Sequence, residues 1–164
     1  MAAWVGFSTS TWHPASMLVR WWTKSRVSHT FLLYDDTNIG LPMVYDVSFT
    51  GLRLIPYSVF LRDNKVVEEI KIEEDLTPGL QVVSRWLGRR YDWGAFFGFC
   101  RLFAKRVRHP SPDPKELICT EAVIHVLRLA GYPEAASLDP KRTSPQALLD
   151  FLNTSPKPNT SPQQ

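Results

Sequence analysis

Two residues in this chain are of the types, and in the local settings, that can perform nucleophilic catalysis. His29 opens the apolar, β-prone run 29–34, and Cys119 opens the run 119–130, whose apolar residues recur with helical spacing. Free N–H groups and the dipole at a helix start favour a thiolate, and an imidazole can take the thiol proton. The pair therefore predicts a thiol nucleophile for acyl transfer, with the histidine before the cysteine in the chain.

Each of the two residues also has a purely structural interpretation. On a helix, Cys119 shares one face with Val123 and Val126, so it can be a buried core cysteine. His29 can be a strand histidine that satisfies a core hydrogen bond. The first turn of a helix favours the nucleophile interpretation for Cys119, because the N–H groups there can also serve as oxyanion donors. Cys100 lies inside an expected helix, and we interpret it as a packing residue.

A catalytic imidazole needs a partner that fixes its tautomer, and Asp46 is the candidate. Asp46 is a single acid inside the apolar strand expected over 43–49. A carboxylate in such a strand is costly unless it is paired or lies at an edge. If this strand pairs with the strand of His29, Asp46 can lie beside the imidazole. The alternative is an exposed position on an alternating strand.

The remaining histidines predict no further chemistry. His125 lies six residues after Cys119 and points away from the thiol on a helix, while His13 and His109 fall outside the expected strands. None of the histidines and cysteines has the spacing of a metal site, and we find no phosphate-binding or dinucleotide-binding glycine motif. We therefore expect neither a metal nor a cofactor.

The pattern of apolar residues, caps and turn formers predicts an α+β domain with helices packed on one side of an antiparallel meander. Strands are expected over 5–8, 27–34, 43–49, 52–57 and 66–72, with a tight turn at Thr50-Gly51. Helices are expected over 14–24, 77–87, 93–107, from 115 or 116 to 130, and from 145 to 152 after a Ser144 cap. Residues 109–114 are too rich in proline for regular structure, and 154–164 should be a disordered tail. Residues 1–153 are thus expected to form a single domain.

Length and composition restrict the class of protein. A chain of 164 residues with six Trp and nine Phe can bury one substantial core. Two cysteines do not form a disulfide framework, and we find neither a signal-peptide pattern nor a run long enough to span a membrane. A cytoplasmic protein is expected. Export without a signal peptide, in a phage particle or by a holin-type route, stays open.

The net charge of +3 is unevenly distributed. Segment 85–108 carries seven basic residues and one acid, so the rest of the chain is negative. Such a run is either a solvated face or a basic rim that attracts an anionic partner. Aromatic residues lie among the basic ones, a pattern typical of modules that bind nucleic acid or protein; they include Tyr91, Trp93, Phe96 and Phe97. This binding function is the alternative to an enzyme.

Four short motifs carry a resemblance to a known family. They are Ser28-His29 at a strand start; Asp46 before the turn at Gly51 and the segment Leu54-Ile55-Pro56; Tyr91-Asp92-Trp93; and Cys119-Thr120-Glu121. Over residues 4–132 the chain resembles the circularly permuted branch of the NlpC/P60 papain-like superfamily, which includes bacterial YiiX/YaeF-like amidases and small phage-encoded relatives. Three positions depart from the family pattern. Gly6-Phe7 stands where Gly-Asp is usual, Thr120 replaces a serine, and Asp46 replaces the commoner glutamate.

The resemblance implies a papain-like α+β hydrolase that cleaves an amide or ester bond through an acyl-enzyme. His29 would take the proton of Cys119, and Asp46 would orient His29. The Cys119 N–H, with the Tyr91 hydroxyl, would stabilise the oxyanion. Trp12 and Trp93 would line a water-excluding groove. Peptides, peptidoglycan stem peptides and lipid esters or amides are all compatible substrates, and the oligomeric state is open. A catalytically inactive phage structural protein is a third interpretation.

Overall fold

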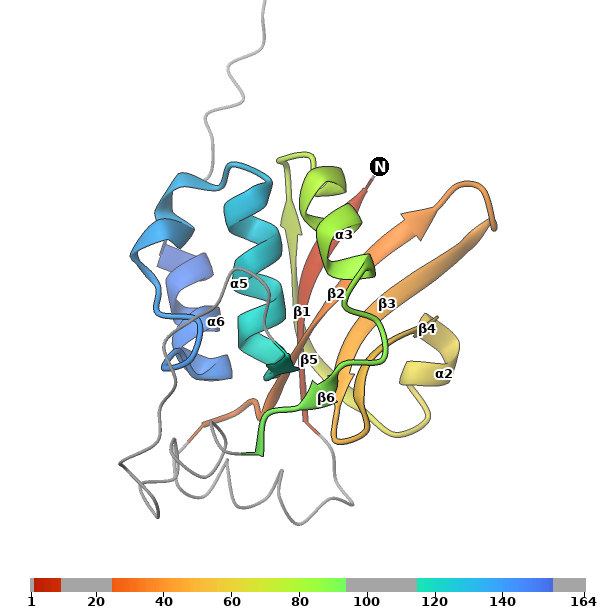
Figure 1. Ribbon diagram of the computed structural model, residues 1–164, viewed down its shortest axis with the longest axis horizontal. Coiled ribbons are helices and arrows are strands. Elements are labelled where there is room, and N and C mark those ends of the chain that lie inside the picture. The colour runs from red at the N-terminus through yellow and green to blue at the C-terminus, as the bar shows by residue number, and fades with distance from the viewer. Residues whose placement is uncertain (1, 10–24, 94–114, 155–164) are drawn as a thin grey trace, which may run out of the picture.

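The computed structural model of the protein describes residues 2–9, 25–93 and 115–154 (Figure 1). Several expectations fall outside these ranges. They concern the helices over 14–24 and 93–107, the proline-rich segment 109–114, the tail after Thr154, and the residues Trp12, His13, Cys100 and His109. Thr154 was assigned to the tail but is the last residue of a helix, where its hydroxyl donates to the Asp150 carbonyl over 2.9 Å.

The described residues form an α+β fold built on a five-stranded antiparallel sheet, as the sequence predicts. The strands are β1 (Ala3–Thr9), β2 (His29–Asp36), β3 (Leu41–Ser48), β4 (Gly51–Pro56) and β5 (Lys65–Ile72). Their order in the sheet is β4-β3-β2-β1-β5. The first four strands are a meander, but β5 returns to pair with β1, which the sequence did not indicate.

The strand boundaries differ from the expected ones by one or two residues, and two of the differences have local reasons. Strand β2 continues beyond the expected end at Tyr34 through Asp35 and Asp36, because these residues pair with Pro42 and Leu41. The Asp36 carboxylate still stabilises the turn by accepting the Asn38 N–H over 2.9 Å. Strand β4 ends at Pro56, where the short helix α2 (Tyr57–Phe60) begins. A helix of one turn has too few residues to show an apolar period.

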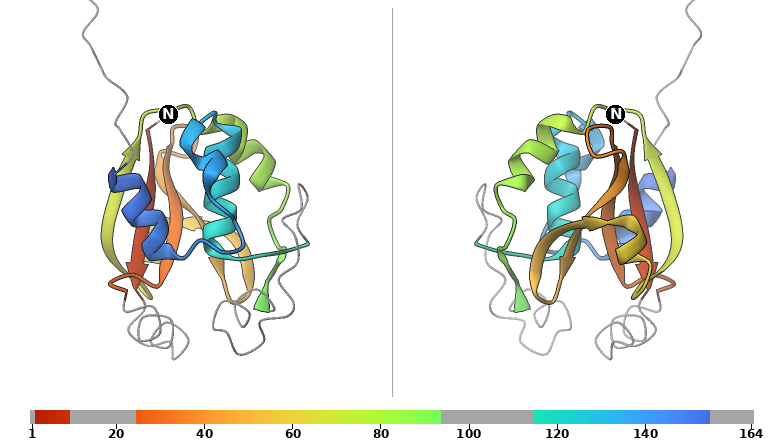
Figure 2. Two further views of the ribbon diagram at one scale, coloured as in Figure 1. Left: turned by 90° about the vertical axis from the view of Figure 1, so that its left-hand side faces the viewer. Right: turned by 90° about the vertical axis from the view of Figure 1, so that its right-hand side faces the viewer.

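Within the described ranges, three longer helices cover one face of the sheet (Figure 2): α3 (Thr77–Ser84), α5 (Cys119–Leu129) and α6 (Pro145–Thr154). The Ser144 cap is confirmed, because its hydroxyl accepts the Ala147 N–H over 3.0 Å. The helix α3 is shorter than the expected 77–87, and residues 85–88 form turns that end at Gly88. A 3-10 helix, η1 (Pro133–Ser137), precedes α6 and was not expected.

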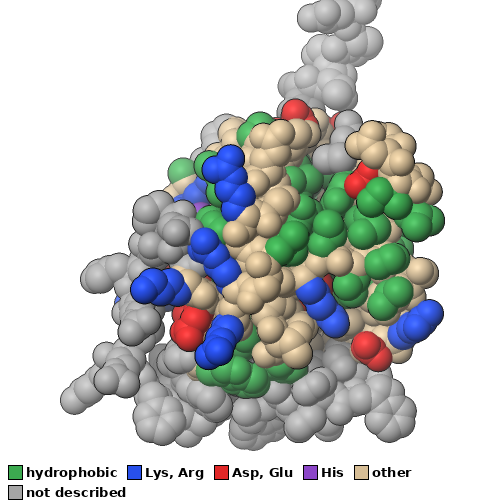
Figure 3. All heavy atoms as spheres, turned by 45° about the vertical axis from the view of Figure 1, so that its right-hand side comes forward, with side chains coloured by type: hydrophobic (Ala, Val, Ile, Leu, Met, Phe, Trp, Pro, Cys, Tyr) green, Lys and Arg blue, Asp and Glu red, His purple; other side chains and the backbone are tan. Residues whose placement is uncertain are grey.

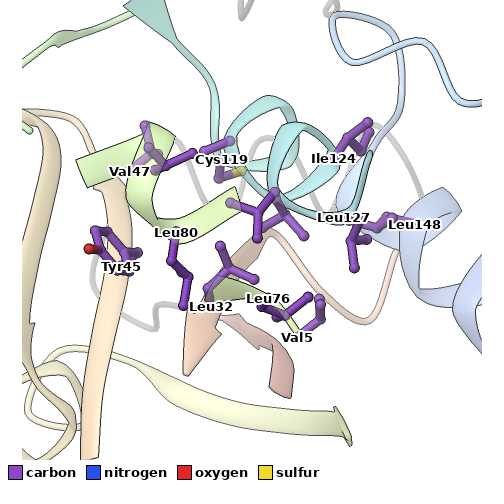
Figure 4. Close-up of a cluster of buried hydrophobic side chains, with 14 of the residues drawn as sticks. Val5, Leu32, Tyr45, Val47, Leu76, Leu80, Cys119, Ile124, Leu127 and Leu148 are labelled. Carbon is purple, nitrogen blue, oxygen red and sulfur yellow. The ribbon is translucent and has the colours of Figure 1, made fainter. Parts of the chain in front are cut away.

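Two hydrophobic clusters fill the two faces of the sheet. The larger one joins alternate residues of the strands to α3, α5 and α6, and Cys119 belongs to it beside Val47 and Leu80 (Figure 4). The smaller one contains Phe31 and Phe60, so α2 covers the opposite face. The expectation of helices on one side only is therefore wrong. Gly79 lets α3 approach α5 closely, since a Cβ there would lie 2.5 Å from the Val126 carbonyl oxygen.

Candidate active site

Cys119 is the first residue of α5, and the chain reaches it through a short strand. Strand β7 (Glu116–Leu117) pairs in parallel with β6 (Arg90–Tyr91), and the extended residue Ile118 is the N-cap of the helix. The helix therefore begins at Cys119 rather than at 115 or 116. This start gives Cys119 the N-terminal position that favours a thiolate. The Cys119 side chain is also largely buried, with 8% of its surface exposed.

His29 and Asp46 lie where two neighbouring strands separate. The pairing of β2 with β3 runs from Asp36–Leu41 to Leu32–Tyr45 and extends no further toward His29. His29, at the start of β2, and Asp46, near the end of β3, lie beyond that last pair. Their side chains meet there, with His29 Nε2 2.6 Å from Asp46 Oδ1. The structure thus brings together the histidine and the acid that the sequence singles out.

The Cys119 thiol and the His29 imidazole lie close enough for each to shift the pKa of the other. Since Nε2 of the imidazole faces Asp46, Nδ1 is the nitrogen left for the thiol. Burial alone would lower the pKa of His29, but Asp46 and then Cys119 outweigh it and raise that pKa to about 10. Burial would raise the pKa of Cys119, yet the bond to His29, the charge of His29 and the N–H groups of Thr30 and Thr120 lower it. Both directions favour a thiolate–imidazolium pair.

Arg53 holds the far side of Asp46, and sequence reasoning missed it. Arg53 lies opposite Asp46 in the β3–β4 pairing, and its Nε donates to Asp46 Oδ2 over 2.7 Å. Its Nη2 lies 2.6 Å from the same oxygen. Burial would raise the pKa of Asp46, but His29 and Arg53 lower it, so the carboxylate stays charged between two cations. The tight turn at Gly51 already implied this register, because it places residues 46 and 53 opposite each other.

Replacing Asp46 by asparagine should lower the pKa of His29 by at least about one unit, because the imidazolium loses its main anionic partner. The measurement is an NMR titration of the His29 ring. The control is Asp35→Asn, which neutralises an exposed acid on β2 and should leave the titration unchanged. An unaltered His29 pKa in folded Asp46→Asn would remove Asp46 from the proposed array.

Tyr91 and Trp93 form an aromatic group beside the strand that leads to Cys119. Tyr91 is largely buried and pairs with Leu117, two residues before the cysteine. The Phe49 ring stacks on Trp93 with centroids 5.1 Å apart, and Tyr91 meets Trp93 edge-on at the same distance. Trp93 exposes 43% of its surface. The roles of the Tyr91 hydroxyl in binding an oxyanion and of Trp93 in lining a groove stay predictions.

A buried cluster of charged side chains lies at the base of α5. The ammonium of Lys141 is 2.7 Å from an Asp92 carboxylate oxygen and 2.7 Å from a Glu121 carboxylate oxygen. The Asp92 carboxylate thus binds Lys141, and the helix expected over 93–107 lies, beyond Trp93, outside the described residues. The sequence carries no signal for Lys141, because Asp139-Pro140-Lys141-Arg142 reads as an exposed polar turn.

Part of the described surface is basic. Figure 3 shows a group of Lys and Arg side chains on one face and hydrophobic side chains beside it. Within the basic segment expected over 85–108, Arg85 and Arg90 are exposed, and the residues after Trp93 lie outside the described ranges. Ile39 and Leu41, at the β2–β3 turn, are exposed hydrophobic residues.

No helix in the described ranges has the length and apolarity needed to cross a membrane.

The chain matches no protein-family model, and no curated protein matches its sequence significantly. A buried thiol, an imidazole that can accept its proton, and a carboxylate fixed by an arginine can together perform nucleophilic attack followed by proton transfer to a leaving group.

Proposed function

We propose that this protein is a thiol hydrolase that cleaves an amide or ester bond through a covalent acyl-Cys119 intermediate. The single observation that carries the proposal is the continuous array of Cys119, His29 and Asp46, in which the imidazole interacts with the thiol and lies 2.6 Å from the carboxylate. Arg53 extends the array by fixing the carboxylate. In an acyl-transfer site, Cys119 would be the nucleophile, His29 the base and Asp46 the acid that orients the base.

The reaction follows from this arrangement in two half-reactions. The Cys119 thiolate attacks the carbonyl carbon, and the N–H groups at the start of α5 face the developing oxyanion. The His29 imidazolium then donates its proton to the leaving amine or alcohol as the carbonyl re-forms, which leaves a thioester on Cys119. A water molecule loses a proton to His29, attacks the thioester and releases the acid. Asp46 keeps the imidazole oriented through both steps.

The resemblance to the permuted NlpC/P60 branch supports a finer proposal for the fold. The strand with the base precedes the helix with the nucleophile in the chain, which is the order expected of that branch. The five-stranded antiparallel sheet with α5 packed against it is compatible with a papain-like domain. Peptide, peptidoglycan-type and lipid carbonyl substrates all suit this chemistry.

The test is multiple-turnover hydrolysis of a panel containing a p-nitrophenyl ester, an aminoacyl anilide and a peptidoglycan stem peptide. We expect at least one substrate to turn over, and Cys119→Ala to lower its kcat by about a thousandfold or more, because the nucleophile is lost. The exposed substitution Ser58→Ala is the control and should leave the rate unchanged. Turnover that persists in Cys119→Ala, or no turnover of any member by the folded protein, would contradict the proposal.

A further inference from the structure

The buried charges around Lys141 take no part in the proposed acyl transfer, yet one of them, Glu121, lies two residues after the nucleophile in the first turn of α5. The Lys141 side chain is 5% exposed and that of Glu121 is fully buried, and each of the two ion pairs measures 2.7 Å. Charges that are removed from water are costly unless they are paired, so this cluster needs all three members in place. The second oxygen of Glu121, Oε1, is buried and has no hydrogen-bond partner among the described residues, so within them the lysine is the main compensation for this carboxylate.

The groups that contact Lys141 belong to the segments that determine where Cys119 lies. Glu121 lies in the first turn of α5, and its Oε2 accepts the N–H of Ile118, the residue before the cysteine, over 3.4 Å. Lys141 also donates to the Glu116 carbonyl of β7 over 3.4 Å. The Asp92 N–H donates to the Leu117 carbonyl over 2.9 Å. One ammonium group therefore ties the end of β6, strand β7 and the start of α5 to one another.

The position of Lys141 is itself fixed by a tight turn. The Asp139 carboxylate accepts the Lys141 N–H over 2.9 Å, and the Asp139 carbonyl accepts the Thr143 hydroxyl over 2.7 Å. The segment that joins η1 to α6 passes beside the start of α5 (Figure 1). Lys141 thus reaches the charged cluster from a structured turn. Through the ion pair of Lys141 with Glu121, the position of this turn affects the position of the start of α5.

We propose that Lys141 is a positioning residue for the Cys119 thiolate. By pairing with Glu121 and Asp92, it holds the first turn of α5 at the distance from β2 at which Cys119 and His29 interact. The interaction with His29 is a main cause of the lowered thiol pKa, so a shift of the first turn would weaken it and raise the pKa. This inference rests on the proposed function, because it assigns Lys141 to the same thiol–imidazole pair.

The experiment follows alkylation of Cys119 by iodoacetamide as a function of pH, resolved by peptide mass spectrometry, in the full chain. In Lys141→Met we expect the acid limb of the profile to move up by at least about one pH unit. The rate at pH 6 should fall about fivefold to tenfold, because fewer thiols are ionised. Lys141→Arg keeps a cation and should shift less. Lys71→Met removes an exposed lysine that pairs with Glu73 and should shift nothing.

A role in stability alone would lower the melting temperature of Lys141→Met and leave the alkylation profile of the folded protein in place. That result overturns the inference. Because Lys141→Met leaves two buried carboxylates without a cation, the triple variant Asp92→Asn, Glu121→Gln, Lys141→Met serves as its folded counterpart and should show the same upward shift. If the acid limb of the Cys119 alkylation profile is unchanged in the variant that folds, the proposal is wrong.

The same measurement separates this inference from the proposed function. If the wild-type Cys119 reacts no faster at pH 6 than a free thiol, or if His29→Ala reacts as fast as the wild type, the proposed function fails. If the wild type is reactive, His29→Ala loses that reactivity and Lys141→Met keeps it, only the positioning role of Lys141 fails.

Discussion

In His29→Ala, Cys119 should be alkylated at pH 6 at least about tenfold more slowly than in the wild type. The imidazolium is the group that outweighs the burial of the thiol, so without it the pKa of Cys119 returns to or above the ordinary value of about 8.5. The thiolate fraction at pH 6 then falls, and the greater nucleophilicity of a more basic thiolate offsets only part of that fall. The measurement is the pH dependence of iodoacetamide labelling, resolved for the peptide that contains Cys119.

The matched control is His125→Gln on the same helix as the thiol. The His125 ring packs edge-on against Trp86 with centroids 5.2 Å apart, and burial lowers its pKa to about 4. Its replacement should leave the labelling profile of Cys119 in place. An identical profile for folded His29→Ala and the wild type would show that the thiol is not activated by His29. Cys100 provides an internal comparison, and we predict that it is inert while Cys119 is the reactive thiol.

Gly51→Ala should lower the free energy of unfolding by about 3 kcal/mol, through left-handed backbone strain and overpacking. Gly51 has a φ of 116°, in a region that side chains with a Cβ rarely adopt. A Cβ there would lie 2.1 Å from the Arg89 carbonyl oxygen, which is backbone and cannot rotate away. The same carbonyl accepts the Leu52 N–H over 2.9 Å, so the clash would separate β4 from the segment before β6.

Urea denaturation of Gly51→Ala measures this loss. The control is Gly40→Ala, where φ is 71° but no atom lies within 4 Å of the added Cβ. We expect it to cost only the backbone strain, about 1 kcal/mol. Equal losses in the two variants would show that Gly51 is needed for its backbone conformation alone. In that case the close approach of the β3–β4 turn to Arg89 contributes little to stability.

Each residue of the site that could be predicted from the sequence is marked by its place in a local pattern of apolar residues. Cys119 stands at the start of an apolar-periodic run, His29 at the start of a β-prone run, and Asp46 is a lone acid in an apolar strand. Local patterns of this kind also define the antiparallel sheet with packed helices. The pairing of Asp46 with His29 follows once the two strands are neighbours in a hairpin.

The parts that could not be predicted depend on contacts between distant segments. Strands β1 and β5 pair although β2, β3 and β4 lie between them in the chain. No single turn connects the two strands, so no turn fixes the register of their pairing. Strands β6 and β7 have two residues each, too few for an alternating pattern. Lys141 lies in a polar turn, and only the packing of that turn under α5 buries it between Asp92 and Glu121.

The most direct test of the central claim is to trap the covalent intermediate. Rapid mixing with an activated ester, followed by acid quench and intact-mass and peptide mass spectrometry, should find one acyl group per protein on Cys119. The acyl group should then disappear as the acid product is released. Acyl transfer should fall by at least about tenfold in His29→Ala at pH 6. If Cys119 stays unmodified, or if the wild type and His29→Ala are acylated equally fast, this protein is not a thiol hydrolase of the proposed kind.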